Sequence, residues 1–217
     1  MSQVKLLHSG GNGVIVAAPA SNPASDITFK LPQADGSANQ VLQTDGSGNL
    51  SWVSLPTGGL PMVDMWHVTQ QTTFQSETAA VNWGRSSGTI DTIGHIGSAM
   101  TNSTQYFTFP STGMYEIEYQ TLAYTSAAEA RYAASYIYVT TNNSNYYRRG
   151  RGYGSVHQDS SQTTFSFGAK IILDVTNVSN TKVYFANACE ATATLEFADL
   201  TNDVIRTYAL FKKLGDT

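Results

Sequence analysis

Short β-type runs recur near the N-terminus of this chain and constrain its fold more than any other feature. Each run combines a few β-branched or large apolar residues with a closing proline or glycine. The starts lie roughly a dozen residues apart, the spacing of a strand plus a turn. The four runs are Val14–Pro19, Ile27–Pro32, Val41–Gly46 and Leu50–Pro56. Because each run is too short and too sparsely apolar to bury its own face, the pattern predicts a shaft or tether that stacks on neighbours or on other copies.

Turn-forming residues divide the chain into two predicted domains. Asp45–Asn49 is a strong turn signal between two runs, since Gly and Asn tolerate the positive φ that tight turns require. Prolines end or flank the runs and restrict the strands to edges or breaks, because proline cannot donate a ladder hydrogen bond. The stretch Leu55–Pro61 is rich in Pro and Gly and predicts a hinge. We therefore expect a repeat domain over residues 1–61 and a second domain over 62–217.

The second domain alternates apolar and polar residues with the period of a β-strand. Tyr115–Gln120 predicts a strand with one buried and one polar face, and Tyr132–Val139 predicts a strand that is covered on both faces. Many short strands at this spacing indicate an antiparallel sandwich, most plausibly a jelly roll. Further strands are predicted at Thr164–Phe167, Lys170–Val175, two runs within Lys182–Phe197, and Val204–Leu210.

Composition excludes several classes of protein. Charged residues make up only 13% of the chain and the net charge is -4, which argues against coiled coils and against nucleic-acid binding. The single cysteine, Cys189, excludes an internal disulfide framework and is predicted to be a small core residue. No window reaches the apolar length of a membrane span, and the N-terminus lacks a signal-peptide pattern. We expect a soluble protein that is made in the cytoplasm and does not insert into membranes.

The N-terminal repeat resembles a known group of proteins. Residues Ala17–Pro32 and Gly36–Trp52 are similar to the repeat region of tail-fibre and appendage proteins of tailed bacteriophages, notably marine ones. This resemblance implies that residues 1–61 contain a virion-attachment segment and a β-repeat stalk. It also implies that the N-terminal segment binds other virion proteins, and that the protein is located in the virion after synthesis in the host cytoplasm.

The second domain resembles the globular heads of the complement-subunit and tumour-necrosis-factor (TNF) superfamily. Phe107–Ile117, with a Pro and a Gly ahead of alternating aromatic residues, is similar to that family's signature, and Thr207–Phe211 is similar to its last strand. The family's collagen-like stalk is absent, and a β-repeat stands in its place. The resemblance implies a jelly-roll head that assembles as a homotrimer. Three chains around one axis would also remove the free strand edges that a single repeat exposes.

A cluster of basic and aromatic residues is the strongest candidate for a binding site. It places arginines and tyrosines in what reads as a glycine-containing loop after a strand. Arg is suited to bidentate contact with phosphate or carboxylate, and Tyr stacks on sugar rings or cations, so the cluster predicts binding of an anionic bacterial surface glycan or lipopolysaccharide. The alternative is an intersubunit contact, with the arginines paired to Glu116 or Glu118 of a neighbour. The candidate residues are Tyr146, Tyr147, Arg148, Arg149, Arg151 and Tyr153.

The sequence contains no recognisable catalytic or metal-binding motif. Glu116 and Glu118 share one face of a strand, but no nearby group completes an acid–base or calcium site, so we expect a solvated or salt-bridged face. The glycines at 10, 11 and 13 lack the Lys-Ser/Thr ending of a phosphate loop, and no nucleophile elbow is present. No two histidines have metal-ligand spacing, although a trimer axis could gather three copies of one. The histidines are His8, His67, His95 and His157.

These features together predict a non-enzymatic phage virion appendage without a cofactor. The protein, a tail fibre or spike, would attach by its N-terminus and present a trimeric head for host-surface recognition, with weak contacts multiplied by valency. Two alternatives stay open. One is a capsid decoration or stabilising protein that binds no host. The other is a glycan depolymerase, which needs paired catalytic carboxylates in a groove and could draw only on Glu116 and Glu118.

Overall fold

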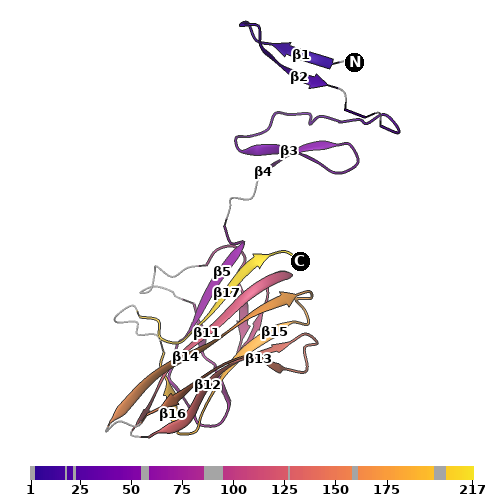
Figure 1. Ribbon diagram of the computed structural model, residues 1–217. Coiled ribbons are helices and arrows are strands. Elements are labelled where there is room, and N and C mark those ends of the chain that lie inside the picture. Colours follow the sequence, from indigo (N-terminus) through magenta and orange to yellow (C-terminus); the bar gives the residue numbers. More distant parts are fainter. Residues whose placement is uncertain are drawn as a thin grey trace. The chain divides into compact units, whose positions relative to one another are not determined.

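The protein is all-β, as the sequence predicts (Figure 1). Its described residues form seventeen strands and no helix, so none of them belongs to a helix that could span a membrane. The chain divides into two units, Met1–Gly59 and Leu60–Thr217, two residues before the predicted boundary. Residues 55–58 of the predicted hinge lie outside the described residues. The computed structural model describes residues 3–17, 19–21, 23–54, 59–85, 95–126, 128–157, 161–197 and 204–217.

The N-terminal unit contains two antiparallel hairpins. β1 (Gln3–Leu7) pairs with β2 (Gly13–Ala17), and β3 (Gln40–Thr44) pairs with β4 (Leu50–Ser54). The turn between β3 and β4 is closed by the Asp45 carboxylate, which accepts hydrogen bonds from the Asn49 side chain and from the backbone N–H of Ser47. These bonds lower the pKa of Asp45. Gly46 and Gly48 have φ of 77° and 87°, so the predicted turn is confirmed.

The predicted strand over Ile27–Pro32 is wrong. This segment forms a single parallel bridge, in which the Lys30 N–H donates to the Gly48 carbonyl at 2.8 Å and the Leu50 N–H donates to the Lys30 carbonyl at 2.9 Å. The ladder cannot continue through Pro32, which lacks an N–H. A side chain at Gly48 would collide with the Thr28 carbonyl, so this glycine permits the close approach. The unit is therefore built from hairpins and a bridging segment, not from four equivalent strands.

The head is a sandwich of two antiparallel sheets. In the first sheet, β14, β11, β17, β5 and β8 are neighbours in that order. β17 pairs with residues 114–120 of β11, and β16 pairs with residues 123–125 of the same strand and in turn with β6. Figure 1 shows β5, β17, β11 and β14 side by side. The strands of the first sheet are β5 (Met62–Val68), β6 (Thr72–Phe74), β8 (Trp83–Gly84), β11 (Gly113–Ser126), β14 (Gln162–Val175), β16 (Ala193–Leu195) and β17 (Tyr208–Gly215).

The second sheet has the order β13-β12-β15-β10-β9, and β7 pairs with β15 beside this path. Among the described residues, β13 is thus an edge strand whose one ladder partner is β12. Its position at the edge matters because it carries the predicted binding cluster. The strands of the second sheet are β7 (Thr78–Ala79), β9 (Thr101–Ser103), β10 (Tyr106–Thr108), β12 (Ala130–Thr140), β13 (Tyr147–Val156) and β15 (Lys182–Cys189).

Two strand predictions in the head need correction. The runs Thr164–Phe167 and Lys170–Val175 belong to one strand, β14, whose ladder with β11 continues in unbroken register through Gly168. A side chain at Gly168 would collide with Gln120 of β11, so this glycine allows close packing and does not end a strand. The last strand, β17, begins and ends later than the predicted Val204–Leu210. Both errors arise because the sequence of a strand does not show which neighbouring strand it pairs with, or how far that pairing extends.

Aromatic side chains from both sheets form the core of the head. Phe107, which is fully buried, lies 5.1–5.5 Å between ring centroids from Trp66, Trp83, Phe185 and Phe211. Burying each such side chain stabilises the fold by about 1.5–3 kcal/mol, and each ring pair adds about 0.5–1.5 kcal/mol. The buried core among the described residues is built entirely from side chains of the head.

Other predictions about buried residues are confirmed. The side chains at 115, 117 and 119 are fully buried while those between them are half-buried, as the predicted alternation requires. Cys189 is only 1% exposed, and burial raises the pKa of its thiol, which makes it a core residue. A buried amide links the sheets: Asn187 accepts from Thr121 at 2.9 Å and donates to the Tyr119 hydroxyl at 2.6 Å. Burial raises the pKa of Tyr119 to about 12.

A buried carboxylate, Asp64 of β5, organises one side of the core. It accepts hydrogen bonds from the Trp66 indole at 3.0 Å and from the Met100 backbone N–H at 2.8 Å. Arg85 donates to both carboxylate oxygens at 3.0 Å, and its guanidinium lies 4.2 Å from the centre of the Trp66 ring. Because Trp66 belongs to the same strand as Asp64, the fully buried carboxylate fixes two other segments, at Arg85 and at Met100, to β5.

Candidate functional site

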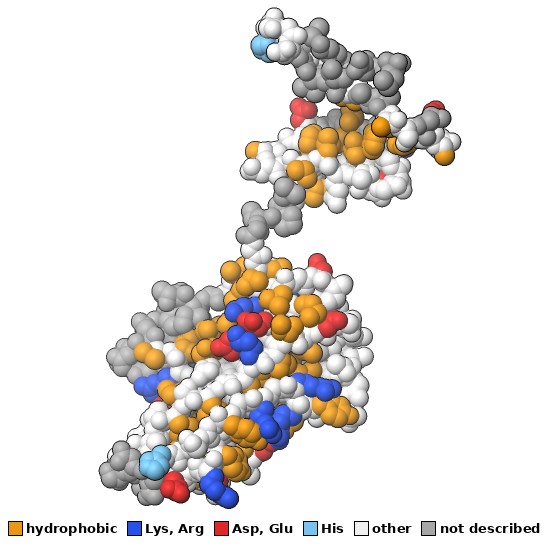
Figure 2. Space-filling model, viewed as in Figure 1, with side chains coloured by type: hydrophobic (Ala, Val, Ile, Leu, Met, Phe, Trp, Pro, Cys, Tyr) orange, Lys and Arg blue, Asp and Glu red, His pale blue; other side chains and the backbone are white. Residues whose placement is uncertain are grey.

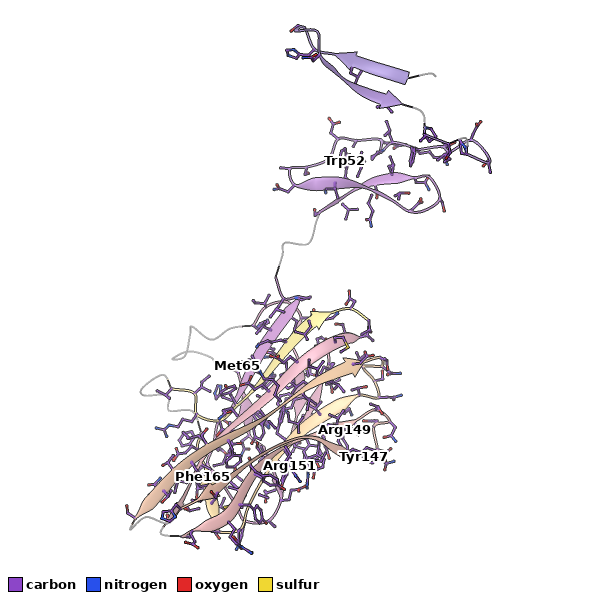
Figure 3. The ribbon with its side chains drawn as sticks, in the orientation of Figure 1. Trp52, Met65, Tyr147, Arg149, Arg151 and Phe165 are labelled. Carbon is purple, nitrogen blue, oxygen red and sulfur yellow. The ribbon has the colours of Figure 1, made fainter. Side chains whose placement is uncertain are left out.

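The predicted binding cluster lies on a strand, so the loop expected there is wrong. Residues 147–153 belong to β13, and Figure 3 shows Tyr147, Arg149 and Arg151 along it. The glycines that suggest a loop have another role. A side chain at Gly150 would come within 2.9 Å of Ile171 of β14, and one at Gly152 would collide with the Gly168 carbonyl. Small residues on this side let β13 pack closely against β14. The other side carries Arg148, Arg151 and Tyr153, which lie across the ladder from Tyr138, Tyr136 and Ala134, and Arg149 lies where the register shifts.

Arg148 is already neutralised within the head. Its guanidinium lies 3.9 Å from the centre of the Tyr136 ring and donates to the Tyr138 hydroxyl at 3.1 Å. It also forms an ion pair with Glu77, which accepts a hydrogen bond from Tyr138 as well. Glu77 lies 71 residues away in sequence, so sequence reasoning had no signal for this pair. Arg148 therefore acts as a structural link on the outer face of the second sheet.

Tyr146 is also part of a structural cluster. Its ring lies 5.2 Å from those of Tyr106 and Tyr184, and Tyr184 stacks on Tyr138 at 4.7 Å with nearly parallel planes. Partial burial raises the pKa of Tyr146, and it raises the pKa of Tyr184 to about 12. These tyrosines form a packed layer on the outer face of the sheet, so β12 is covered on both faces over residues 133–139 as predicted, whereas Tyr132 at the start of the predicted range is exposed.

Arg149 and Arg151 differ from Arg148, because neither has a carboxylate partner among the described residues. Each lies over a tyrosine of its own strand: Arg149 is 5.3 Å from the ring centre of Tyr147, and Arg151 is 4.2 Å from that of Tyr153. All four side chains are exposed. Figure 2 shows Lys and Arg side chains beside hydrophobic ones on this face of the head. The structure thus splits the predicted cluster into a neutralised part and two exposed cation–aromatic pairs.

An open hollow lies beside the second of these pairs, and we call it the tyrosine hollow. Its volume is about 680 Å³. Tyr136 is only 4% exposed, whereas Tyr132 and Tyr153 are 41% and 53% exposed. Arg131 at the edge is held by Glu190, which accepts from its backbone N–H and its Nε, both at 2.7 Å, and these bonds lower the pKa of Glu190. The hollow is lined by Arg131, Tyr132, Tyr136, Tyr153, Gly154 and Ser155.

Glu116 and Glu118 form a salt-bridged face, as predicted. Glu116 pairs with Lys212 at 2.9 Å and with Lys170 at 3.6 Å, and Glu118 pairs with Lys170 at 3.0 Å and accepts from Tyr208 at 3.1 Å. The hydrogen bond from Lys212 lowers the pKa of Glu116. The alternative is that β13 arginines pair with these two carboxylates of a neighbouring subunit. Glu116 and Glu118 would then have to give up their ion pairs with Lys170 and Lys212 of their own subunit.

The histidines do not gather in one place. His67 is only 4% exposed, burial lowers its pKa, and its Nδ1 has no hydrogen-bond partner. The other three, at 8, 95 and 157, are exposed. Among the described residues, no three His, Cys, Asp or Glu side chains lie together as metal ligands would.

Comparison with known proteins shows the fold of the head. No family model matches the chain, and no curated protein matches it. The structure of Eiger TNF from S. frugiperda is similar, with a TM-score of 0.53 and 11% identity over 73% of this chain and 94% of that one. Murine APRIL at pH 8.5 has a TM-score of 0.49 and 14% identity, over 70% of this chain and 98% of that one. At this identity the likeness to Eiger TNF shows a shared fold only, so the expected TNF-like jelly roll is confirmed.

Proposed function

We propose that this protein is a non-enzymatic, homotrimeric virion appendage of a bacteriophage, whose TNF-like head recognises the host surface. The observation that carries the proposal is the pairing of a self-sufficient jelly-roll head with an N-terminal unit in which no described side chain is buried. Such a unit needs partners, and the phage-like repeat suggests that these are other copies of the chain and the proteins of the virion.

Exposed apolar side chains of the N-terminal unit support self-association. Ile27, Phe29 and Leu31 alternate along one extended segment and are 65%, 64% and 73% exposed. Alternate residues of an extended chain share one side, so these three form an apolar row. Each would be stabilised by about 1.5–3 kcal/mol if fully buried. Threefold packing of the stalk buries this row, and the TNF-like fold of the head agrees with the same symmetry.

The head offers a recognition surface that suits multivalent binding. Arg149, Arg151 and their tyrosines are exposed on an edge strand beside the tyrosine hollow. A trimer presents three such surfaces, so weak single-site binding to a surface polymer is multiplied. A depolymerase would need two carboxyl groups beside the bound glycan, and among the described residues no Asp or Glu lines this hollow.

Two measurements test the proposal on the full-length chain. Size-exclusion light scattering at micromolar concentration should give the mass of three chains, and a folded monomer would overturn the trimer. Fluorescent protein should bind cells of the phage host, and replacing both exposed arginines, Arg149 and Arg151, by glutamate should reduce this binding. If the protein binds no cells and its deletion makes particles fragile, it is a capsid decoration protein.

A further inference from the structure

The tyrosine hollow contains the groups that recognise a sugar ring. Tyr132 of β12 and Tyr153 of β13 border it and are both substantially exposed, while Tyr136 is nearly buried. Tyrosine presents a flat apolar ring with a hydrogen-bonding hydroxyl, which suits the alternation of C–H and O–H groups on a pyranose. Ser155 adds a further hydroxyl to the lining. A volume of about 680 Å³ accommodates one or two sugar residues, and the open shape lets a longer polymer extend beyond them.

Two of the three arginines near the hollow are paired with a carboxylate among the described residues, and the third is not. Arg131 is paired with Glu190, and Arg148, which packs on Tyr136, is paired with Glu77. Arg151 stands directly across the ladder from Tyr136 and lies on the ring of Tyr153, so it adjoins two of the residues that line the hollow. It has no carboxylate partner among the described residues. One uncompensated guanidinium therefore adjoins an aromatic-lined hollow, and a guanidinium binds an anionic oxygen group through paired hydrogen bonds.

We infer that the tyrosine hollow binds an acidic sugar, with the pyranose ring against Tyr132 and Tyr153 and the negatively charged group on Arg151. The inference rests on the proposed recognition function and names its ligand class. The acidic group supplies the partner that Arg151 lacks, and the tyrosines supply affinity for the ring. Neutral sugars of the same shape cannot pair with Arg151 and therefore bind more weakly.

The strand supplies its own matched control. Arg149 with Tyr147 repeats the cation–aromatic pair of Arg151 with Tyr153 on the same strand, and all four side chains are exposed. Tyr153 lines the hollow, however, whereas Tyr147 does not. Arg151→Gln and Arg149→Gln therefore change the charge equally. If binding is a general effect of positive charge, the two variants lose affinity equally. If the hollow is the site, only Arg151→Gln and Tyr153→Ala lose it.

The experiment uses the full-length protein and an array of bacterial surface glycans, each acidic glycan accompanied by its carboxyl-reduced or dephosphorylated counterpart. Titration calorimetry then measures the tightest pair. We expect at least tenfold weaker binding of the neutral counterpart and of Arg151→Gln, which corresponds to about 1.4 kcal/mol, and less than twofold change for Arg149→Gln. Carboxylated and phosphorylated glycans form separate arms and distinguish the source of the charge.

Three results would overturn the inference. They are equal binding of acidic and neutral counterparts, equal loss in Arg151→Gln and Arg149→Gln, and displacement of the glycan signal by a nucleoside monophosphate but not by free acidic sugar. Failure of the parent proposal looks different, because then the wild-type protein is monomeric or binds no host cells. If cells are bound but Arg151→Gln binds them as well as wild type does, recognition occurs elsewhere on the head and only this site is refuted.

Discussion

The two units of this chain use the same secondary structure but bury very different surfaces. In the N-terminal unit, two hairpins and a bridging segment leave every described side chain at least partly exposed. In the head, paired sheets enclose Phe107, Tyr115, Ile117 and many other fully buried side chains. β-hairpins alone do not make a stable fold, because a single layer has no second surface against which to bury its apolar face.

This difference indicates where each unit obtains its stability. The head owes its stability to its own core, so it should unfold cooperatively as one unit. We expect the N-terminal unit to depend on contacts outside itself, as a stalk would, because none of its described side chains is buried. Four predictions test this contrast, beginning with the largest expected effect.

The strongest test removes the centre of each unit's packing. Phe107→Ala should destabilise the head by about 3–5 kcal/mol, since it leaves a large cavity among packed rings. Trp52 is the counterpart in the N-terminal unit: its indole donates to the Ala34 carbonyl at 3.0 Å and its ring packs against Gly36, yet it is 37% exposed. Trp52→Ala should leave head unfolding unchanged in urea denaturation followed by near-UV circular dichroism. If Trp52→Ala lowers the free energy of unfolding of the head as much as Phe107→Ala does, the stability of the head does not come from its own core alone.

The second prediction concerns the buried carboxylate of the head. Asp64→Ala should cost about 3 kcal/mol, because it leaves the Arg85 charge and the Trp66 and Met100 donors without their acceptor. The matched surface change, Glu118→Ala, removes a partly exposed pair and should cost less than about 1 kcal/mol. Thermal unfolding of both variants provides the measurement. Equal costs would mean that the network around Asp64 contributes no more than a surface ion pair.

The third prediction concerns the apolar row of the N-terminal unit. Replacing Ile27, Phe29 and Leu31 by serine should make residues 19–54 far more sensitive to proteinase K while the head stays resistant and trimeric. The double variant Thr28→Ser and Lys30→Ser changes the alternate positions of the same segment and should have little effect. Limited proteolysis followed by mass spectrometry gives the cleavage rates. If both variants are cut at the wild-type rate, the row is not buried in the assembly.

The head was more predictable from sequence than the N-terminal unit for the same physical reason. Residues Tyr115–Gln120 alternate between apolar and polar because one face of β11 is buried and the other is not. The buried core therefore produces a period of two that can be recognised in the sequence. In Ile27–Pro32 the same alternation of apolar residues occurs without a core, and it led to a strand that the structure lacks. Alternation of apolar and polar residues therefore indicates which side chains are buried. It predicts a paired strand only where such a buried face exists.

The candidate site was only partly predictable. Arginine and tyrosine content identified β13, but its glycines suggested a loop because the β14 residues that Gly150 and Gly152 pack against, Ile171 and Gly168, are distant in sequence. The pair Arg148–Glu77 likewise joins residues that no local motif connects. Sequence therefore indicated which residue types could bind a ligand. Only the fold separates Arg151, which has no carboxylate partner among the described residues, from Arg148, which is paired with Glu77.

The smallest expected effect is a pH dependence confined to the head. Burial lowers the pKa of His67 below its usual value near 6.5, so the folded head keeps this side chain neutral where the unfolded chain takes up a proton. The stability contributed by the neutral side chain is present above about pH 6.5 and is lost as pH falls toward the folded-state pKa. We expect the free energy of unfolding to decrease by about 1 kcal/mol or less per pH unit between pH 6.5 and 5.5, the limit for one proton. His67→Gln should remove this slope, whereas His8→Gln in the N-terminal unit should retain it because His8 is exposed. Urea denaturation at both pH values provides the comparison, and an unchanged slope in His67→Gln would assign the pH dependence to other groups.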